Sequence, residues 1–179
     1  MNRIVILGCA GSGKSTLSQR IGERTGLPVH HLDSYFWKSG WIAAEPEAFD
    51  AEVVRLAAGE RWIIDGNYSR TLDLRLQRSD TVIFFDYPRY LCLYRVWKRR
   101  FQYAGRSRAD MGEGCPEKID LSFLKWIWFF RKRNRPKLLN KLREAQKHQT
   151  VYIFRHPREA NDFLKRLAHT GAFAEGGSH

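Results

Sequence analysis

The chain has 179 residues, of which 43% are apolar, so it has the length and composition of one globular domain with a sizeable core. Its formal net charge is +12, and 16 Lys and Arg against 4 Asp and Glu lie between residues 87 and 143. A solvated basic face explains scattered lysines, but the many arginines in this part favour a polyanionic ligand, because guanidinium groups bind phosphate oxygens in pairs.

The first element is a short apolar run, Arg3–Leu7, which predicts a buried parallel strand. It leads into residues 8–16, whose pattern G-x-x-x-x-G-K-[ST] is that of a phosphate-binding loop. A helix should follow and end at Gly26, before Pro28. Strand, loop and helix in this order predict a nucleoside triphosphate site.

Each residue type in the loop has a physical role. Glycines let backbone N–H groups turn toward a phosphate, Lys14 would reach the β- and γ-phosphates, and the Ser15 hydroxyl would bind Mg²⁺. The helix N-terminus also favours an anion. We therefore predict ATP and Mg²⁺ as cofactors, with nucleotide ligands at Gly8, Gly11, Ser12, Gly13, Lys14, Ser15 and Thr16.

Five candidate strands alternate with helical patterns, which predicts a parallel sheet covered by helices on both faces. The expected class is α/β, a three-layer P-loop NTPase fold with a five-stranded parallel sheet. Acids follow three of the strands, and all three should lie at the sheet edge that carries the phosphate loop. These acids are Asp33, Asp65 and Asp86, and the strands are 3–7, 29–32, 62–64, 81–85 and 151–154.

The basic third should be a helical lid region, at about residues 95–135. A helix from Tyr90 places Tyr90, Tyr94, Trp97 and Phe101 on one stripe, which we expect to be buried, and Arg95 and Arg99 on another face. A loop should span residues 105–116. A largely apolar helix, 120–133, would follow, and Pro136 would begin another.

One domain, residues 1–170, and a mobile tail, 171–179, account for the whole chain. Cys9, Cys92 and Cys115 have neither metal-ligand spacing nor the pairing of a secreted scaffold. The early first strand leaves no room for a signal peptide, and no apolar stretch could span a membrane. We expect a cytoplasmic protein in which Cys9 is a passive loop residue rather than a redox sensor.

The arrangement resembles the adenylate-kinase-like group of P-loop kinases and, in detail, the DNA topology modulation protein family. The similarity runs over residues 3–167 and rests on four stretches, 8–16, 31–37, 62–72 and 114–118. One departure concerns the segment after Asp65-Gly66. Adenylate kinases carry Phe-Pro-Arg there, whereas this chain has Asn67-Tyr68-Ser69-Arg70, which leaves the phosphoryl acceptor open.

The resemblance implies roles for single residues. Asp65 would hold Mg²⁺, with a strand-end turn as the alternative, and Asp33 would face the acceptor hydroxyl, with helix capping as the alternative. Arg155 would contact the adenine or simply begin a helix. Catalytic lid arginines would be Arg95, Arg99 and Arg106, with Arg108 in reserve. The acceptor would contact Asp33, Trp37, Asn67 and Arg70, although core packing is an equal alternative for Trp37.

Three functions remain open. The leading one is a Mg²⁺-dependent kinase that moves the γ-phosphate of ATP to a small acceptor, such as a nucleotide. A variant of it phosphorylates a sugar-like metabolite. The rival is a nucleotide-dependent DNA-binding or regulatory protein that influences DNA topology and binds nucleic acid through Arg131, Lys132, Arg133 and Arg135. The apolar helix 120–133 is also compatible with an oligomer.

Overall fold

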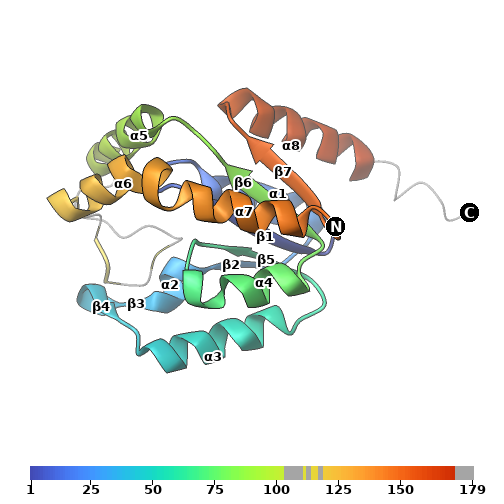
Figure 1. The fold of residues 1–179 in the computed structure, drawn as a ribbon, viewed down its shortest axis with the longest axis horizontal. Helices are drawn as coiled ribbons and strands as arrows, with labels where there is room; N and C mark the ends of the chain where they lie inside the picture. The colour runs from blue at the N-terminus through green and yellow to red at the C-terminus, as the bar shows by residue number, and fades with distance from the viewer. Residues whose placement is uncertain (103–110, 112–113, 117–118, 172–179) are drawn as a thin grey trace, which may run out of the picture.

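The structure is a computed structural model that describes residues 1–102, 111, 114–116 and 119–171. It is built around a five-stranded parallel sheet (Figure 1). The strands of this sheet are β1 (Arg3–Gly8), β2 (Val29–His31), β5 (Trp62–Asp65), β6 (Thr81–Phe85) and β7 (Thr150–Phe154). A small antiparallel hairpin, β3 (Trp37–Lys38) and β4 (Ile42–Ala43), stands apart from it.

The helices are α1 (Lys14–Thr25), α2 (Leu32–Phe36), α3 (Pro46–Ala57), α4 (Leu72–Arg78), α5 (Arg89–Gln102), α6 (Leu121–Arg133), α7 (Arg135–Ala145) and α8 (Pro157–Gly171). Two single 3₁₀ turns, Ser39–Trp41 and Ser69–Thr71, complete the described elements. No helix in the described part of the chain is both long and apolar enough to cross a membrane.

The strand order in the sheet is β2-β5-β1-β6-β7, with every pair parallel. β1 is the central strand, because it pairs with β5 on one side and β6 on the other. The chain therefore crosses from one half of the sheet to the other beside the end of β1. Open parallel sheets bind ligands at such a point, outside the carboxyl ends of the strands.

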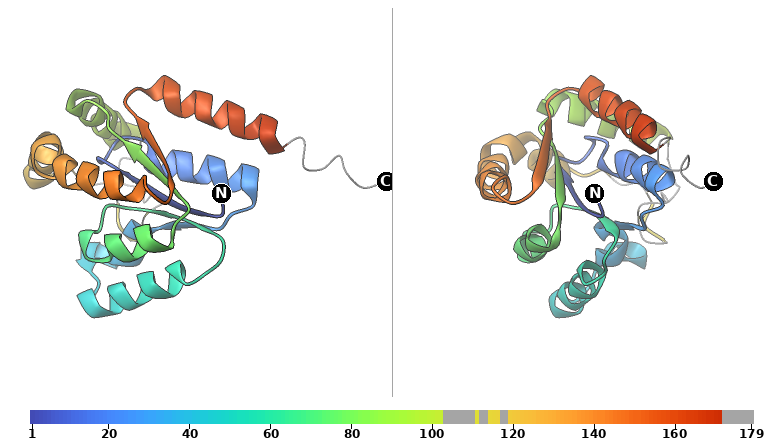
Figure 2. Two further views of the ribbon diagram at one scale, coloured as in Figure 1. Left: turned by 45° about the vertical axis from the view of Figure 1, so that its right-hand side comes forward. Right: turned by 90° about the vertical axis from the view of Figure 1, so that its right-hand side faces the viewer.

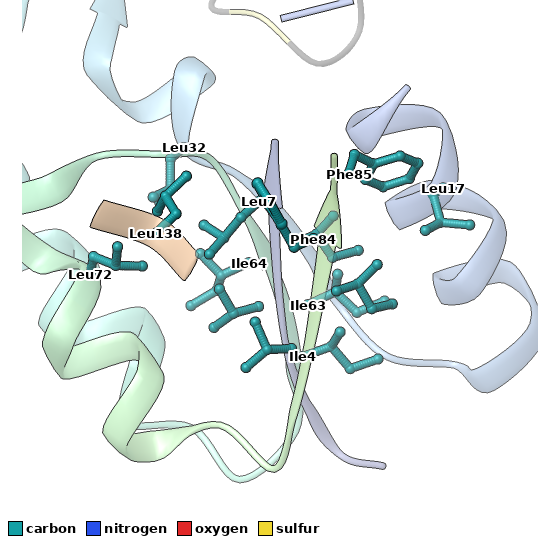
Figure 3. Close-up of a cluster of buried hydrophobic side chains, with 14 of the residues drawn as sticks. Ile4, Leu7, Leu17, Leu32, Ile63, Ile64, Leu72, Phe84, Phe85 and Leu138 are labelled. Carbon is teal, nitrogen blue, oxygen red and sulfur yellow. The ribbon is translucent and has the colours of Figure 1, made fainter. Parts of the chain in front are cut away.

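Helices cover both faces of the sheet and so form three layers. In the right-hand view of Figure 2 the sheet is seen almost edge-on, with α1 and α8 on one face and α4 and α7 on the other. The core follows from this arrangement. Figure 3 shows Leu17 of α1 beside Phe85 on one side of the strands, and Leu72 and Leu138 on the opposite side. The inner strands β1, β5 and β6 are almost entirely buried on both faces, as their apolar sequences predict, whereas the edge strands β2 and β7 are partly exposed.

The five strands predicted from apolar runs are confirmed, and their ends shift by one residue at most. Gly26 caps α1 with a left-handed backbone, as expected. Asp120 caps α6 by accepting a hydrogen bond from Phe123 N–H at 2.8 Å, and proline stands at the start of α7. The expected three-layer P-loop fold is correct.

The predicted stripe on α5 is wrong. Tyr90, Tyr94, Trp97 and Phe101 are between 51% and 75% exposed, whereas the residues of this helix that are buried are Cys92 and Val96. The reason lies in the phosphate loop, which comes so close that the carbonyl oxygen of Cys92 would lie 2.4 Å from a Cβ at Gly11. A helix approached this closely presents small side chains to its neighbour.

Candidate functional site

The phosphate loop ends in an open helix N-terminus. Gly13 is the N-cap of α1, with φ of 98°, and no side chain caps this end. The N–H groups of the first turn, from Lys14, Ser15 and Thr16, are therefore available to an anion. At Gly13 an added Cβ would lie 3.5 Å from the Arg95 guanidinium, so this cation is close to the end of the loop. The loop fits a nucleotide phosphate.

The loop is fixed at its first residue by Asn67. The side-chain amide of Asn67 donates to Gly8 O at 2.7 Å and accepts from Gly8 N–H at 3.1 Å. Gly8 itself has φ of 146°, and a Cβ there would lie 2.7 Å from the Cβ of Phe85. Asn67 was predicted to bind the acceptor, and it does line the large cavity described at the end of this subsection. Both polar atoms of its amide, however, are bonded to the phosphate loop.

Helix α5 is fixed to the other side of the loop. Arg95 donates from Nη1 to Ser12 O at 2.9 Å, and its guanidinium lies 5.6 Å from the ring centre of Tyr87. Arg95 and Arg99, one turn apart, both line the cavity described below. Two cations on one helix face are best accommodated by an anion between them. Arg106, the third predicted lid arginine, and Arg108 lie outside the described residues.

Cys9 of the loop contacts Cys92 of α5. The hydrogen bond between the two thiols, together with burial, raises the pKa of Cys9 well above its ordinary value. All three cysteines are free and buried. Because a thiol that stays protonated is a weak nucleophile, this environment agrees with a passive role for Cys9.

Asp65 lies at the end of β5 and is only 4% exposed. Its Oδ2 atom accepts from the Ser18 hydroxyl at 2.9 Å and lies 2.9 Å from His31 Nδ1. Ser18 is on α1, one turn after Lys14, so the carboxylate joins β5, β2 and α1 behind the phosphate loop. In this position Asp65 would act on Mg²⁺ through a water molecule, while Ser15 lines the cavity directly.

Asp33 occupies the first turn of α2 and lines the same cavity as the phosphate loop. Its Oδ1 atom accepts from the Tyr68 hydroxyl at 2.7 Å. Burial, reinforced by the Asp33 carboxylate, raises the pKa of Tyr68 well above its ordinary value, so the phenol remains a donor. The position of the Asp33 carboxylate is thereby fixed while it still lines the cavity.

Arg75 also stabilises the backbone of residues 66–68, a role that no sequence pattern predicted. It is fully buried on α4 and donates to Gly66 O and Tyr68 O, both at 2.8 Å. Burial lowers the pKa of Arg75 to about 10, against the attraction of Asp65, so the group is still charged at neutral pH. Arg75 thus fixes the backbone on both sides of Asn67.

Several predicted site residues are engaged elsewhere. Arg70 pairs with Asp50 at 2.8 Å and with Glu47 at 3.7 Å and is absent from the cavity lining. The backbone N–H of Arg155 donates to Glu159 at 2.6 Å. The side chain of Arg155 is exposed outside the lining as well, and α8 contributes Pro157, Ala160, Asn161 and Leu164 instead.

The third strand-end acid and the proposed DNA contacts are also placed. Arg135 forms two hydrogen bonds to Asp86, at 2.6 and 2.7 Å, and this pairing raises the pKa of Arg135. Arg131 and Lys132 are exposed at the end of α6, and Arg133 lies 4.9 Å from the ring centre of Phe129. Arg135 is therefore engaged in a structural ion pair. Of the four residues proposed to contact DNA, Arg131, Lys132 and Arg133 remain exposed to a polyanion.

One cavity of about 1380 Å³ brings these parts together. Ligand sites for one small molecule have volumes of about 300–1,000 Å³, so this cavity has room for a nucleotide and a second substrate. Its cationic lining comes from the phosphate loop, α1 and α5: Lys14, Arg20, Arg95, Lys98 and Arg99. Its aromatic lining includes Phe36, Trp37, Trp41, Tyr68, Phe123 and Trp126.

The fold is that of P-loop kinases, as comparison with solved structures shows. A shikimate kinase from Acinetobacter baumannii superimposes with a TM-score of 0.56 at 15% identity, covering 98% of this chain and 96% of that one. A gluconokinase from Sinorhizobium meliloti 1021 gives 0.52 at 19% identity, with 97% of each chain covered. A shikimate kinase from Bacteroides thetaiotaomicron gives 0.53 at 17%, covering 94% and 97%.

At these identities the likeness carries the fold, and the activity must be argued from the site. No protein-family model matches the sequence, and no curated protein matches it. The broader part of the resemblance, to P-loop kinases, agrees with the solved structures. Its finer part, to DNA topology modulation proteins, has no support among them.

Proposed function

We propose that the protein is an ATP- and Mg²⁺-dependent phosphotransferase that moves the γ-phosphate to a hydroxyl group of a small acceptor. The observation that carries this proposal is the open N-terminus of α1, which faces a cavity large enough for two substrates. A protein that only binds or hydrolyses a nucleotide does not need the second half of that cavity.

The triphosphate would lie over residues 11–16. Backbone N–H groups would bind the phosphate oxygens, and Lys14 would neutralise charge on the β- and γ-phosphates. Bound Mg²⁺, held by Ser15 and through water by Asp65, would supply further positive charge to the phosphates. Arg95 and Arg99, which line the same cavity from α5, would stabilise the charge that builds up during transfer.

Asp33 is the proposed proton acceptor. The acceptor hydroxyl oxygen forms a bond to the γ-phosphorus while the bond from that phosphorus to the bridging oxygen breaks, and the electron pair leaves with ADP. The hydroxyl proton passes to the Asp33 carboxylate and then to water. The Tyr68 hydroxyl, 2.7 Å from Asp33 Oδ1, orients the carboxylate for this step.

The test is ADP release measured in a coupled assay over a panel of hydroxylated metabolites, nucleosides and nucleotides. An acceptor should accelerate ADP release at least tenfold over ATP alone, and Lys14→Ala should abolish the acceleration. Lys137→Ala, an exposed lysine of α7 outside the cavity, is the matched control. Calorimetry that detects no ATP binding in the presence of Mg²⁺, or unchanged turnover in Lys14→Ala, would refute the proposal.

The DNA-linked alternative receives no support from the comparisons, and the pairing of Arg135 with Asp86 removes one of its four proposed contacts. It remains a prediction of the sequence. Duplex DNA that binds at low salt, with an affinity that falls steeply as salt rises, would support it.

A further inference from the structure

We propose that helices α5 and α6 form a docking surface for an anionic lipid bilayer, on which the protein lies without crossing it. The centre of this surface is an open groove between the two helices, lined by Leu93 and Trp97 from α5 and by Leu121, Leu124 and Trp128 from α6, among others. The groove shares no lining residue with the large cavity. The proposal therefore goes beyond the phosphotransferase function and does not depend on it.

Exposed apolar side chains are concentrated on these two helices. In the described part of the chain, eight of the eleven large apolar side chains that are exposed belong to α5 or α6. Leu121 is 75% exposed, Trp97 is 51% exposed and Trp128 is 40% exposed. The two helices lie side by side at one end of the molecule (Figure 1). A group of exposed rings and leucines around one groove indicates an interaction surface.

Both helices are also strongly cationic. α5 contains five Lys and Arg, α6 contains four, and neither helix contains an Asp or a Glu. Three of these cations, Arg95, Lys98 and Arg99, line the large cavity, and the others do not. Residues 103–118, which join the two helices in the sequence, contain three cations and three acids, so they do not change the net charge of this part of the chain.

Some of the cations contact the groove or its rings. Lys125 lines the groove. The Arg89 guanidinium lies 4.0 Å from the ring centre of Trp128, and that of Arg133 lies 4.9 Å from the ring centre of Phe129, which also lines the groove. Apolar and cationic groups are therefore interspersed on one surface. Such a surface complements a partner that is both apolar and negatively charged.

A bilayer fits these features better than a second copy of the chain does. Two copies that met through this surface would bring the cations of both into one interface, and like charges that face each other are unfavourable. Another protein is also a poorer partner, because the centres of protein–protein interfaces are depleted in lysine, whereas Lys125 lines this groove.

A bilayer also fits better than a nucleic acid. Proteins bind single strands by stacking bases on the faces of aromatic rings. Here Arg89 lies over the ring of Trp128, and Trp97 is stacked on Phe101 with 28° between the ring planes. The aliphatic side chains of the groove, such as Leu121, offer bases no ring to stack on.

The composition of the surface is that of proteins bound at the bilayer interface. Trp and Tyr rings lie at the level of the headgroups, and leucines contact the upper acyl chains. Lys and Arg lay their apolar stems along the same surface while their charged ends reach the lipid phosphates. Tyr90, 63% exposed and edge to face with Trp128, extends the aromatic part of the surface along α5.

The experiment measures co-sedimentation of the full chain with two kinds of vesicle. One kind contains phosphatidylcholine alone, and the other contains phosphatidylcholine mixed with anionic phosphatidylglycerol. The partition coefficient should be about tenfold or more higher on the anionic vesicles, and it should fall as the salt concentration rises. Brominated acyl chains in the anionic vesicles should quench tryptophan fluorescence, and Trp97→Phe should reduce this quenching.

Two pairs of variants assign the binding to this surface. The double variant Trp97→Ala with Leu121→Ala should lower the partition coefficient on anionic vesicles about tenfold. Its matched control is Ile42→Ala with Val54→Ala, two residues that are 63% and 47% exposed outside α5 and α6.

The second pair tests the charge. Lys125→Glu should lower the partition coefficient by about fivefold or more, since each cation near the bilayer surface contributes to binding. Arg78→Glu, at an exposed position on α4, changes the net charge by the same amount and should have a smaller effect. All the substituted side chains are exposed, and circular dichroism checks that each variant is folded.

Several results would overturn the proposal. The protein could fail to bind either kind of vesicle, bind both equally, or bind anionic vesicles just as well when Trp97 and Leu121 are replaced. A dimer in sedimentation equilibrium that the same double variant dissociates would assign the surface to a second copy instead. Single-stranded DNA binding that this variant abolishes, without binding to vesicles, would assign it to a nucleic acid. No nucleotide is present in these assays, so their outcome is independent of the proposed phosphotransferase function.

Discussion

The amide of Asn67 bonds both backbone polar groups of Gly8, at 2.7 and 3.1 Å, and so joins the segment after β5 to the first residue of the phosphate loop. An amide side chain can do this because it carries a donor and an acceptor side by side. The same segment continues into Tyr68, which orients Asp33. The nucleotide side and the acceptor side of the cavity are therefore linked through one short stretch of chain.

Asn67→Ala should weaken ATP binding about 30-fold, because two hydrogen bonds that position the loop are worth about 2 kcal/mol together. Asn67→Asp should be at least as weak, since a carboxylate cannot donate to Gly8 O. Calorimetric titration with ATP and Mg²⁺ measures the effect. Asn140→Ala, on the exposed face of α7, should leave the affinity unchanged. Wild-type affinity in Asn67→Ala would show that the loop is positioned without this amide.

Gly11 should tolerate alanine far less than Gly26 does. Both have positive φ, 76° and 65°, which costs a non-glycine residue about 1–2 kcal/mol. At Gly26 nothing lies within 4 Å of an added Cβ, whereas at Gly11 the Cys92 carbonyl oxygen would lie at 2.4 Å. Either the loop or α5 must then move. Urea unfolding should give Gly11→Ala more than twice the loss of Gly26→Ala, with weaker ATP binding. Equal losses would contradict the close approach.

The strands and the phosphate loop were predictable because their signals are local. An apolar run of four or five residues, or the eight-residue phosphate-loop motif, can be recognised without knowledge of distant contacts. The contacts that complete the site are not local. Asn67 meets Gly8 across 59 positions, and Arg135 meets Asp86 across 49. No sequence period indicates such partners, so Asn67 was expected at the acceptor and Arg135 on DNA.

Arg75 and Trp97 lie in environments opposite to those that their sequence positions predict. In the sequence Arg75 resembles a surface arginine on a short helix. It is fully buried, because its guanidinium donates to the backbone carbonyl groups of Gly66 and Tyr68 in the segment that follows β5. The aromatic stripe of α5, with Trp97 in it, reads as a buried face. It is exposed because the loop at Gly11 selects the face with Cys92. A helical period shows which residues share a face, but the neighbouring element decides which face is covered.

The ion pair between Arg135 of α7 and Asp86, which follows β6, should contribute strongly to the free energy of unfolding. The Asp86 side chain is only 4% exposed, so Arg135→Met would leave a buried carboxylate without its partner. Breaking a buried pair from one side costs about 3 kcal/mol. Urea unfolding should show this loss for Arg135→Met, a smaller loss for the double variant Asp86→Leu with Arg135→Met, and almost none for Arg133→Met, whose side chain is exposed. A double variant that is less stable than Arg135→Met would contradict this account.

Asp80 should make the stability depend on acid pH. Burial raises its pKa, but hydrogen bonds from Asn2 N–H, the Thr81 hydroxyl and Arg3 N–H outweigh burial and leave the pKa below its ordinary value. Because the folded pKa is lowered, the stabilisation is complete above the unfolded pKa of about 4 and is lost as the pH falls through the folded pKa.

The stability difference between the wild type and Asp80→Ala should therefore be largest at pH 5 to 7 and should shrink below about pH 4. Urea midpoints at a series of pH values measure it. Asp162→Ala removes an exposed carboxylate of α8, 57% exposed and 3.8 Å from Lys165, and should show a small difference at every pH. A gap between wild type and Asp80→Ala that stays constant down to pH 3 would mean that the carboxylate is not held by charge-assisted hydrogen bonds at the start of β1.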